Sequence, residues 1–178
     1  MTGKALYALA AVALIAGCKA QEPANQTNAV IPSAETGNAA SSGANLTADQ
    51  ALAVAKEREE HMEALGDATK KIGNELKGSA PDVAAIQQSA AKIADLAPKL
   101  QSWFAPGTAV GVGKSRAKAE IWEKSEDFAL KSQDFERAAQ EFKVAADRGD
   151  LTRIRTTFEA LGKSCKACHD LYRAPKKD

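Results

Sequence analysis

The chain has 178 residues, with 24 Lys and Arg against 23 Asp and Glu, and 5% of its residues are aromatic. This balance excludes the basic excess that is typical of nucleic-acid-binding domains, and it excludes a long acidic tail. Ala, Lys and Glu are common while β-branched residues are scarce, so the composition favours helices over sheets, in one domain with additional segments.

Residues 1–17 have the features of an export signal. Lys4 precedes an uncharged run of apolar and small residues from Ala5 to Ala16, which is too short to span a bilayer. The run leads through Gly17 to Cys18, a pattern that resembles a bacterial lipobox, in which the cysteine is acylated and becomes the new N-terminus. An ordinary signal followed by a chance cysteine is the alternative.

The cysteine count favours the lipoprotein. Three cysteines in an exported protein leave one odd thiol, and lipidation of Cys18 would account for it. The residue after the cysteine is Lys19 and not Asp. By resemblance to bacterial lipoproteins, this favours the outer membrane over retention in the inner membrane. Residues 19–46 are rich in Ala, Asn, Ser, Gly and Thr and lack aromatic residues, so we expect a flexible linker. The predicted divisions are a signal (1–17), a lipidated cysteine with its linker (18–46) and a helical domain (47–178).

The helical domain begins with a capping box formed by Thr47 and Gln50. Apolar or aliphatic side chains then recur by threes and fours on one stripe, and Gly78 is a plausible C-terminal residue of this first helix. The stripe contains Ala51, Val54, Arg58, Met62, Leu65, Thr69, Ile72 and Leu76. A second helix is predicted from Pro81 until Pro98 stops or kinks it.

Two further helices follow a long connection. Residues 98–115 are interrupted by Pro and Gly, and we expect Trp103 and Phe104 to attach this loop to the core. The third helix is predicted from about Arg116 to Arg148, and the fourth from an Asp150 cap to Pro175. Four amphipathic helices, mostly with short turns, predict an all-α, antiparallel four-helix bundle.

Near the C-terminus, Cys165-Lys166-Ala167-Cys168-His169 forms a C-x-x-C-H motif, which is typical of covalent haem attachment. Residues i and i+3 share a helix face, so both sulfurs can reach the two vinyl groups of one porphyrin, and His169 follows as the proximal iron ligand. Gly162, one turn earlier, leaves room for the macrocycle. A zinc site would lack ligands, a redox C-x-x-C belongs in a βαβ context, and a disulfide would not explain the histidine.

Four segments make the domain similar to the cytochrome c′ family over residues 47–178. They are REEHMEALG (58–66), WFAPGT (103–108), EIW (120–122) and CKACHDLYR (165–173). The position of the haem motif near the C-terminus is that of class II c-type cytochromes. The resemblance implies a periplasmic protein, usually a homodimer, that holds one covalent haem c between its helices with one edge exposed.

The resemblance places Met62 at the distal side of the haem, four residues after Arg58. Met62 is expected either to ligate the iron, which gives a low-spin haem suited to electron transfer, or to cover an open position that binds NO or CO. Simple core packing is the alternative. Arg58 is expected to pair with a haem propionate, or otherwise to be a surface arginine with a buried stem.

Arg173 lies one turn after His169 and is expected to flank the proximal pocket, unless it is only a solvated charge at the helix end. Trp122, Phe104 and Tyr172 are candidates for packing on the haem, although each is equally suited to the core. His61 points about 100° away from Met62 on the helix, so we expect it to be exposed and not a ligand.

Three functions fit these residues. The first is a membrane-tethered one-electron carrier in the periplasm with redox protein partners, and the second is a haem protein that sequesters or senses NO or CO. An enzymatic role such as peroxide reduction ranks below both, because apart from His61 no distal acid–base pair is evident. We therefore expect no enzyme.

Overall fold

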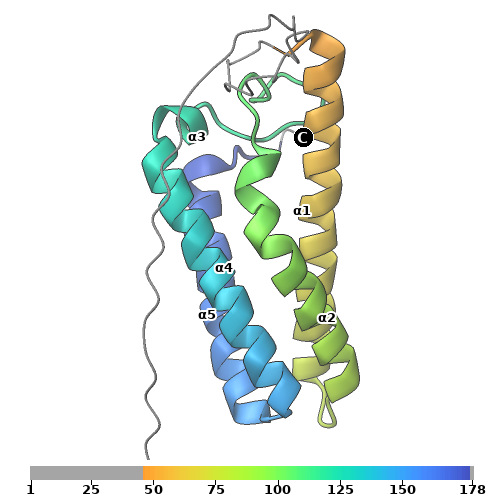
Figure 1. Cartoon of the computed structure of the whole chain (residues 1–178). Coiled ribbons are helices and arrows are strands. Elements are labelled where there is room, and N and C mark those ends of the chain that lie inside the picture. Colours follow the sequence, from red (N-terminus) through yellow and green to blue (C-terminus); the bar gives the residue numbers. More distant parts are fainter. Residues whose placement is uncertain (1–45, 177–178) are drawn as a thin grey trace, which may run out of the picture. The chain divides into compact units, whose positions relative to one another are not determined.

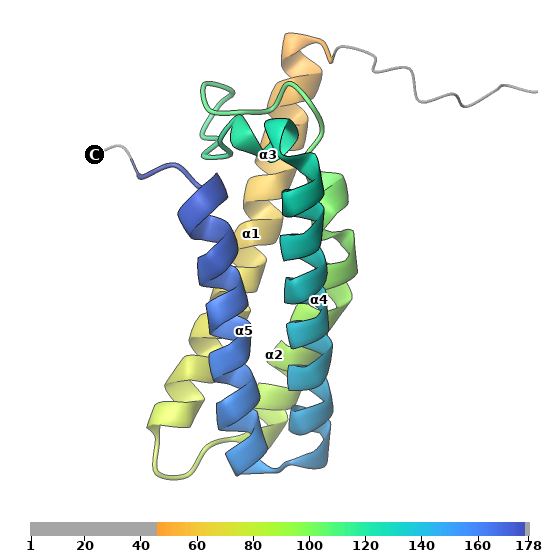
Figure 2. The ribbon, with the colours of Figure 1, turned by 90° about the vertical axis from the view of Figure 1, so that its left-hand side faces the viewer.

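The computed structural model describes residues 46–176, so the predicted signal, lipid anchor and most of the linker lie outside the described part. The helices are α1 (Ala48–Lys77), α2 (Val83–Leu96), the 3-10 helix η1 (Ala97–Trp103), α3 (Glu120–Glu123), α4 (Ser125–Arg148) and α5 (Leu151–Tyr172). The four long helices form an antiparallel bundle (Figures 1 and 2), which confirms the predicted fold class. Among the described residues, no helix combines the length and the apolar character needed to cross a membrane.

Local side-chain contacts define where the helices begin. The Thr47 hydroxyl accepts from the Gln50 amide, and the Gln50 side chain accepts from the Thr47 amide, so the predicted capping box is present. Asp82 caps α2 and Asp150 caps α5. Gly149 has φ +67°, a left-handed conformation that ends α4 and lets the chain turn directly into α5.

The core lies along the axis of the bundle and receives side chains from all four long helices. Its largest fully buried members are Phe142, Ile72, Ile86, Ile93, Ile154 and Leu161. Each such side chain stabilises the fold by roughly 1.5–3 kcal/mol through removal of apolar surface from water. The helices pack as α1 on α2, α2 on α4 and α4 on α5, whereas α1 and α5 do not pack closely on each other. The bundle is thus closed on three sides and looser on the fourth.

The third predicted helix starts later than expected. Residues 116–118 run beside the end of α5 in place of coiling, with Lys118 N donating to Tyr172 O at 3.0 Å and Ala174 N donating to Arg116 O at 2.8 Å. The helix is also broken at Lys124, which separates α3 from α4. The second α-helix ends at Leu96, two residues before Pro98, as expected, and the chain continues as the 3-10 helix η1.

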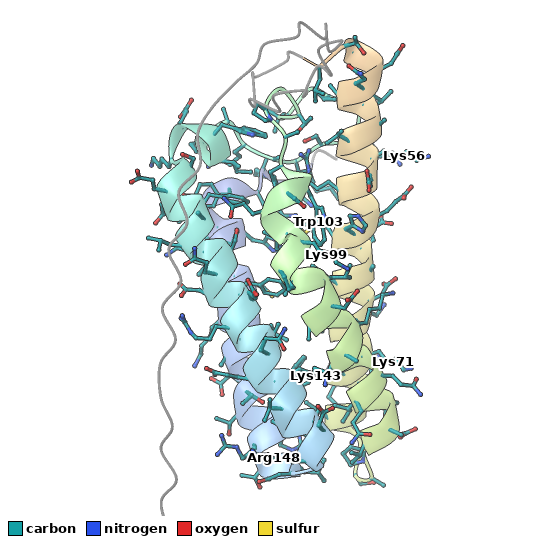
Figure 3. The ribbon with its side chains drawn as sticks, in the orientation of Figure 1. Lys56, Lys71, Lys99, Trp103, Lys143 and Arg148 are labelled. Atoms are coloured by element: carbon teal, nitrogen blue, oxygen red, sulfur yellow. The ribbon has the colours of Figure 1, made fainter. Side chains whose placement is uncertain are left out.

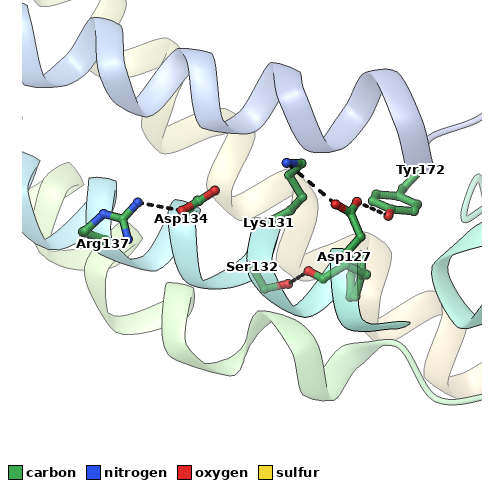
Figure 4. Close-up of polar contacts among 7 residues, drawn as sticks. Asp127, Lys131, Ser132, Asp134, Arg137 and Tyr172 are labelled. Carbon is green, nitrogen blue, oxygen red and sulfur yellow. Dashed lines mark hydrogen bonds and ion pairs between the residues drawn. The ribbon is translucent and has the colours of Figure 1, made fainter. Parts of the chain in front are cut away.

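A polar contact joins α5 to α4 close to the C-x-x-C-H motif. The buried Tyr172 donates its hydroxyl to Asp127 Oδ2 at 2.5 Å, and Lys131 lies 4.0 Å from the other carboxylate oxygen (Figure 4). Burial of the phenol raises the pKa of Tyr172 to about 12, and the hydrogen bond and negative charge of Asp127 act in the same direction. The neutral phenol is therefore the form that the folded chain stabilises.

This contact predicts a loss of stability at high pH. The unfolded chain releases the phenol proton near pH 10 and the folded chain near pH 12, so the contribution is complete below pH 10 and is lost as the pH rises towards 12. Tyr172 and Tyr7 are the two tyrosines, and Tyr7 lies within the predicted signal, so phenolate absorbance of the processed protein reports Tyr172 alone. Asp127→Asn should move the midpoint back towards 10. A midpoint near 10 in the unaltered protein, while helical circular dichroism persists, would contradict this interpretation.

Candidate functional site

The C-x-x-C-H motif occupies the last two turns of α5, and its side chains point both into the bundle and out of it. Cys165 and Cys168 are partly buried, pack against the hydrophobic core and are not paired with each other in a disulfide. His169 lies on the exposed part of the same helix end. The two sulfurs are therefore directed towards the interior from one helix, as attachment of one flat group along α5 requires.

The protonation states of these groups suit haem attachment better than thiol redox chemistry. Burial raises the pKa of Cys165, and it raises that of Cys168 to about 11, so neither thiol has the lowered pKa of a reactive redox cysteine. Although His169 is exposed overall, partial desolvation of its ring lowers its pKa, and the positive charges of Arg173 and Arg116 lower it further. A neutral imidazole is the form that can ligate a metal.

The end of α5 is held in place by the segment that precedes α3. In addition to the two backbone hydrogen bonds given above, Arg116 Nε donates to Ala174 O at 2.8 Å and Lys118 Nζ donates to Leu171 O at 2.7 Å. A helix end normally frays, so these contacts supply order that α5 alone would lack. These contacts of residues 116 and 118 therefore fix the position of the C-x-x-C-H motif at the end of α5.

The side chains that meet across the α1–α5 side establish the register of the two helices. A Cβ on Gly73 would lie 3.8 Å from the Phe158 ring, and Arg155 Nη1 donates to Leu76 O at 2.5 Å. Met62 lies eleven residues before Gly73, and His169 lies eleven residues after Phe158. Because the helices are antiparallel and each residue advances about 1.5 Å, Met62 and His169 lie at the same level, about 16 Å from the Gly73–Phe158 contact.

The α1–α5 side is hollowed along part of its length. A groove of about 590 Å³ lies between the helices at the level of the Gly73–Phe158 contact and reaches along α5 to Lys166. Its lining includes Gly73, Leu76, Phe158 and Gly162 but not Met62, Cys165, Cys168 or His169. A Cβ added to Gly162, or to Gly66 one turn after Met62, would meet no atom within 4 Å. Both glycines are exposed, so this space is open to solvent, and room for a macrocycle beside Gly162 stays a prediction. The features that fit a haem attached to α5 are the two free thiols on one helix face, the adjacent imidazole and the loose packing of α1 on α5.

Arg58 holds the long connection between η1 and α3. Its side chain donates three hydrogen bonds of 2.7 Å, to Thr108 Oγ1, Thr108 O and Ser115 Oγ. It also lies over the Phe104 ring, with Cζ 4.9 Å from the ring centre. Arg58 is 5% exposed, so the alternative of a surface arginine is wrong. Burial lowers the pKa of Arg58, but a guanidinium remains charged.

The aromatic candidates lie at the same end of the bundle as Met62 and the haem motif. Phe104 contacts Phe128 edge-on with ring centres 4.8 Å apart, and Phe128 contacts Tyr172 at 5.4 Å. Trp122 donates its indole proton to Phe104 O at 3.0 Å. Tyr172 is part of the core, Phe104 and Trp122 pack against it, and a role of the three in packing on haem stays a prediction.

His61 and Met62 differ in their surroundings although they are adjacent. The His61 ring stacks on Trp103 with centres 4.5 Å apart and is one-third exposed, so it is less exposed than expected. Met62 is partly buried and packs against the core. Arg173 is exposed, and its charge reaches His169. These positions are consistent with the predicted roles without testing ligation.

Several residues that support the site were not identified from the sequence. Thr108 and Ser115 bind Arg58, Asp127 binds Tyr172, and Phe128 joins two of the predicted aromatic residues. The seven-residue spacing of Gly66 and Gly73 on the stripe of α1 that faces α5 is a signal that could have indicated a gap. The partners of Arg58 carry no comparable signal, because they are 50 and 57 residues away.

The Arg58 contacts predict a loss of stability in Thr108→Val. Thr108 is fully buried, and its hydroxyl both accepts from Arg58 and donates to Ala105 O at 2.7 Å. Removal of a hydrogen bond to a charged group should lower the free energy of unfolding by about 1.5–3 kcal/mol. Thr156→Val is the control, because Thr156 is exposed and surface changes have effects within about 0.5 kcal/mol. Urea unfolding measures both, and equal effects would refute the assigned role of Thr108.

Comparisons with known proteins agree with this site. The family model described as Cytochrome C′ matches residues 53–173. Cytochrome c′ of Pararhodospirillum photometricum is 36% identical over 116 residues, which is 65% of this chain and 92% of the relative. A solved cytochrome c′ with ligand-controlled dimer dissociation has a TM-score of 0.67 at 30% identity and covers 74% of this chain and 100% of its own.

A second solved structure is a ferrous cytochrome c′ variant from Alcaligenes xylosoxidans with bound NO. It has a TM-score of 0.63 at 32% identity and covers 73% of this chain and 98% of its own. The family match, the bundle and the haem motif agree on the class of protein. The chain therefore belongs to the cytochrome c′ family, whose members are four-helix c-type cytochromes with one covalently attached haem c.

Proposed function

We propose that this protein is an exported one-electron carrier in which Cys165 and Cys168 attach the haem, His169 is the proximal ligand and Met62 is the distal ligand. The observation that carries the proposal is the register of α1 and α5, which puts Met62 and His169 at the same level on facing helices. When bound, the haem supplies an iron that alternates between the ferrous and ferric states. A thioether ligand opposite a histidine favours the ferrous state and raises the potential.

The surrounding residues keep this arrangement stable during electron transfer. Thioether bonds to α5 prevent loss of the cofactor outside the cytoplasm, and the contacts of residues 116–118 hold the imidazole in one position. Arg58 fixes the loop one turn from Met62. Its Nε makes no hydrogen bond within the described residues and remains the donor for a haem propionate. We assign Arg173 to the rim of the proximal side, and Trp122, Phe104 and Tyr172 to the packing at one end of the haem.

The second candidate function is binding of NO or CO at an open iron position. It is favoured by the cytochrome c′ structures from Alcaligenes xylosoxidans that are described with bound NO and with bound CO. In that case Met62 covers the distal position without ligating. The two candidates share every other residue of the site and differ in one bond.

The spectrum of the reduced protein distinguishes the two candidates. The carrier should show narrow, split low-spin bands that CO leaves unchanged, and Met62→Ala should give a broad high-spin band that CO shifts. Met1 and Met62 are the two methionines and Met1 lies in the predicted signal, so another methionine cannot replace Met62 in the processed protein. Leu65→Ala, which opens a cavity in the core on the same helix, is the control and should stay low-spin. A high-spin, CO-sensitive spectrum of the unaltered protein would refute the carrier and support the gas binder.

The location follows from the N-terminal sequence, and we propose a periplasmic domain tethered by a lipid on Cys18, with the outer membrane favoured. Full-length protein expressed in an exporting host should sediment with membranes and dissolve in detergent. Cys18→Ser should release it to the soluble periplasmic fraction if the signal is otherwise cleaved. Cys165→Ser is the control, since it removes one haem bond and leaves the anchor intact. Membrane attachment that survives Cys18→Ser would exclude the lipid anchor.

A further inference from the structure

The groove between α1 and α5 has a cationic rim. Its lining includes the cationic side chains of Lys77, Arg155, Lys163 and Lys166, and the one acidic side chain among its nine lining residues is Glu159. The apolar lining residues described above lie between these charges. An apolar surface with charge of one sign at its edge is the arrangement found where proteins dock transiently.

The positive charge of this rim is local. The whole chain has a formal charge of +1, so an excess of cations at one place is matched by acidic residues elsewhere. A smaller depression of about 350 Å³ between α4 and α5 illustrates the contrast, because its lining mixes acidic and basic residues. Its lining has Lys131, Arg137 and Lys163 against Asp134 and Glu141, a net charge of +1, whereas the lining of the α1–α5 groove has four basic residues and one acidic residue, a net charge of +3. The α1–α5 groove is thus the more positively charged of these two depressions, and Lys163 borders both.

The rim lysines remain available to a partner although they form ion pairs. Lys163 lies 2.6 Å from Glu159, and Lys166 lies 2.6 Å from Asp170, both as i,i+4 pairs on α5. The two lysine side chains are 75% and 74% exposed, and such exposed pairs contribute roughly 0–1 kcal/mol. A second carboxylate can therefore replace or share either partner at little cost.

We propose that this cationic rim is the docking surface for a redox partner protein that carries an acidic patch around its own cofactor. The proposal rests on the carrier function given above, because Gly162, Lys163 and Lys166, which line the groove, flank the attachment residue Cys165 on α5. Docking there brings the partner beside the helix that holds the haem. One electron then passes between the two cofactors without any bond being formed or broken. Charge complementarity steers the encounter, and the weak exposed pairs let the complex separate quickly.

The test maps where an anion docks on the haem-loaded protein. Hexacyanochromate(III) is a paramagnetic trianion that broadens nearby NMR signals, and hexacyanocobaltate(III) is its diamagnetic reference. In the reduced, ¹⁵N-labelled protein, broadening should centre on the amides of residues 155–166 and Lys77 and should weaken as salt is added. The double variant Lys163→Glu with Lys166→Glu should reduce this broadening several-fold.

The matched control is Lys99→Glu with Lys143→Glu. Lys99 projects from η1 and Lys143 from α4 (Figure 3), and each also forms an i,i+4 pair with an aspartate. This control changes the total charge equally and breaks the same number of pairs, but it should leave the broadening at the groove unchanged. Equal losses in both double variants, or broadening centred elsewhere, would overturn the proposal.

Two further outcomes separate the proposal from its alternatives. Co-sedimentation of the Cys18→Ser protein with phosphatidylglycerol vesicles, abolished by the Lys163 and Lys166 reversals, would assign the rim to a membrane and overturn the protein partner. The anion map does not depend on ligation by Met62 or on electron transfer. A high-spin spectrum together with anion-induced broadening at the groove would therefore refute the carrier function alone. A low-spin spectrum without broadening at the groove would refute the docking surface alone.

Discussion

The open side between α1 and α5 is the constraint on which the haem site depends. Side-chain packing closes the other three sides of the bundle, and the buried core supplies the stability that lets one side remain loose. Glycines at 66, 73 and 162 place no side chain on this side of α1 and α5. In the proposed site, a fourth packed side would give a more stable bundle with no place for a porphyrin, so local stability is exchanged for binding.

A buried arginine organises the end of this open side. Arg58 has no carboxylate among its partners in the described part of the chain, and neutral oxygens and an aromatic ring surround it. A buried charge is costly to leave without partners, so the loop that supplies those oxygens is strongly tied to one conformation. The same loop carries Phe104, whose carbonyl holds Trp122. One residue of α1 thus transmits the position of the helix to the aromatic cluster beside the motif.

The features that the sequence predicted correctly are local. The capping box at Thr47, the cap at Asp150 and the C-x-x-C-H motif each depend on residues within four positions of one another, and the helical stripes depend on a repeat. The start of the third helix was misjudged at residues 116–119, because a distant strand-like contact with Ala174 prevails over local propensity. The partners of Arg58 and Tyr172 were missed for the same reason, since they lie 45 or more residues away.

The distal position of the iron and the charged rim of the groove determine different properties of the protein. In the proposed site, electron transfer and gas binding differ in one short-range bond between the iron and Met62. In the proposed docking, the choice of partner depends on charges at the rim of the groove, which act over about 8 Å at physiological salt and do not depend on that bond. Because the two are physically separable, substitution on α1 can change the chemistry of the iron while α5 keeps its partner. A bundle of this kind can therefore acquire a new function at the iron while it keeps the same redox partners.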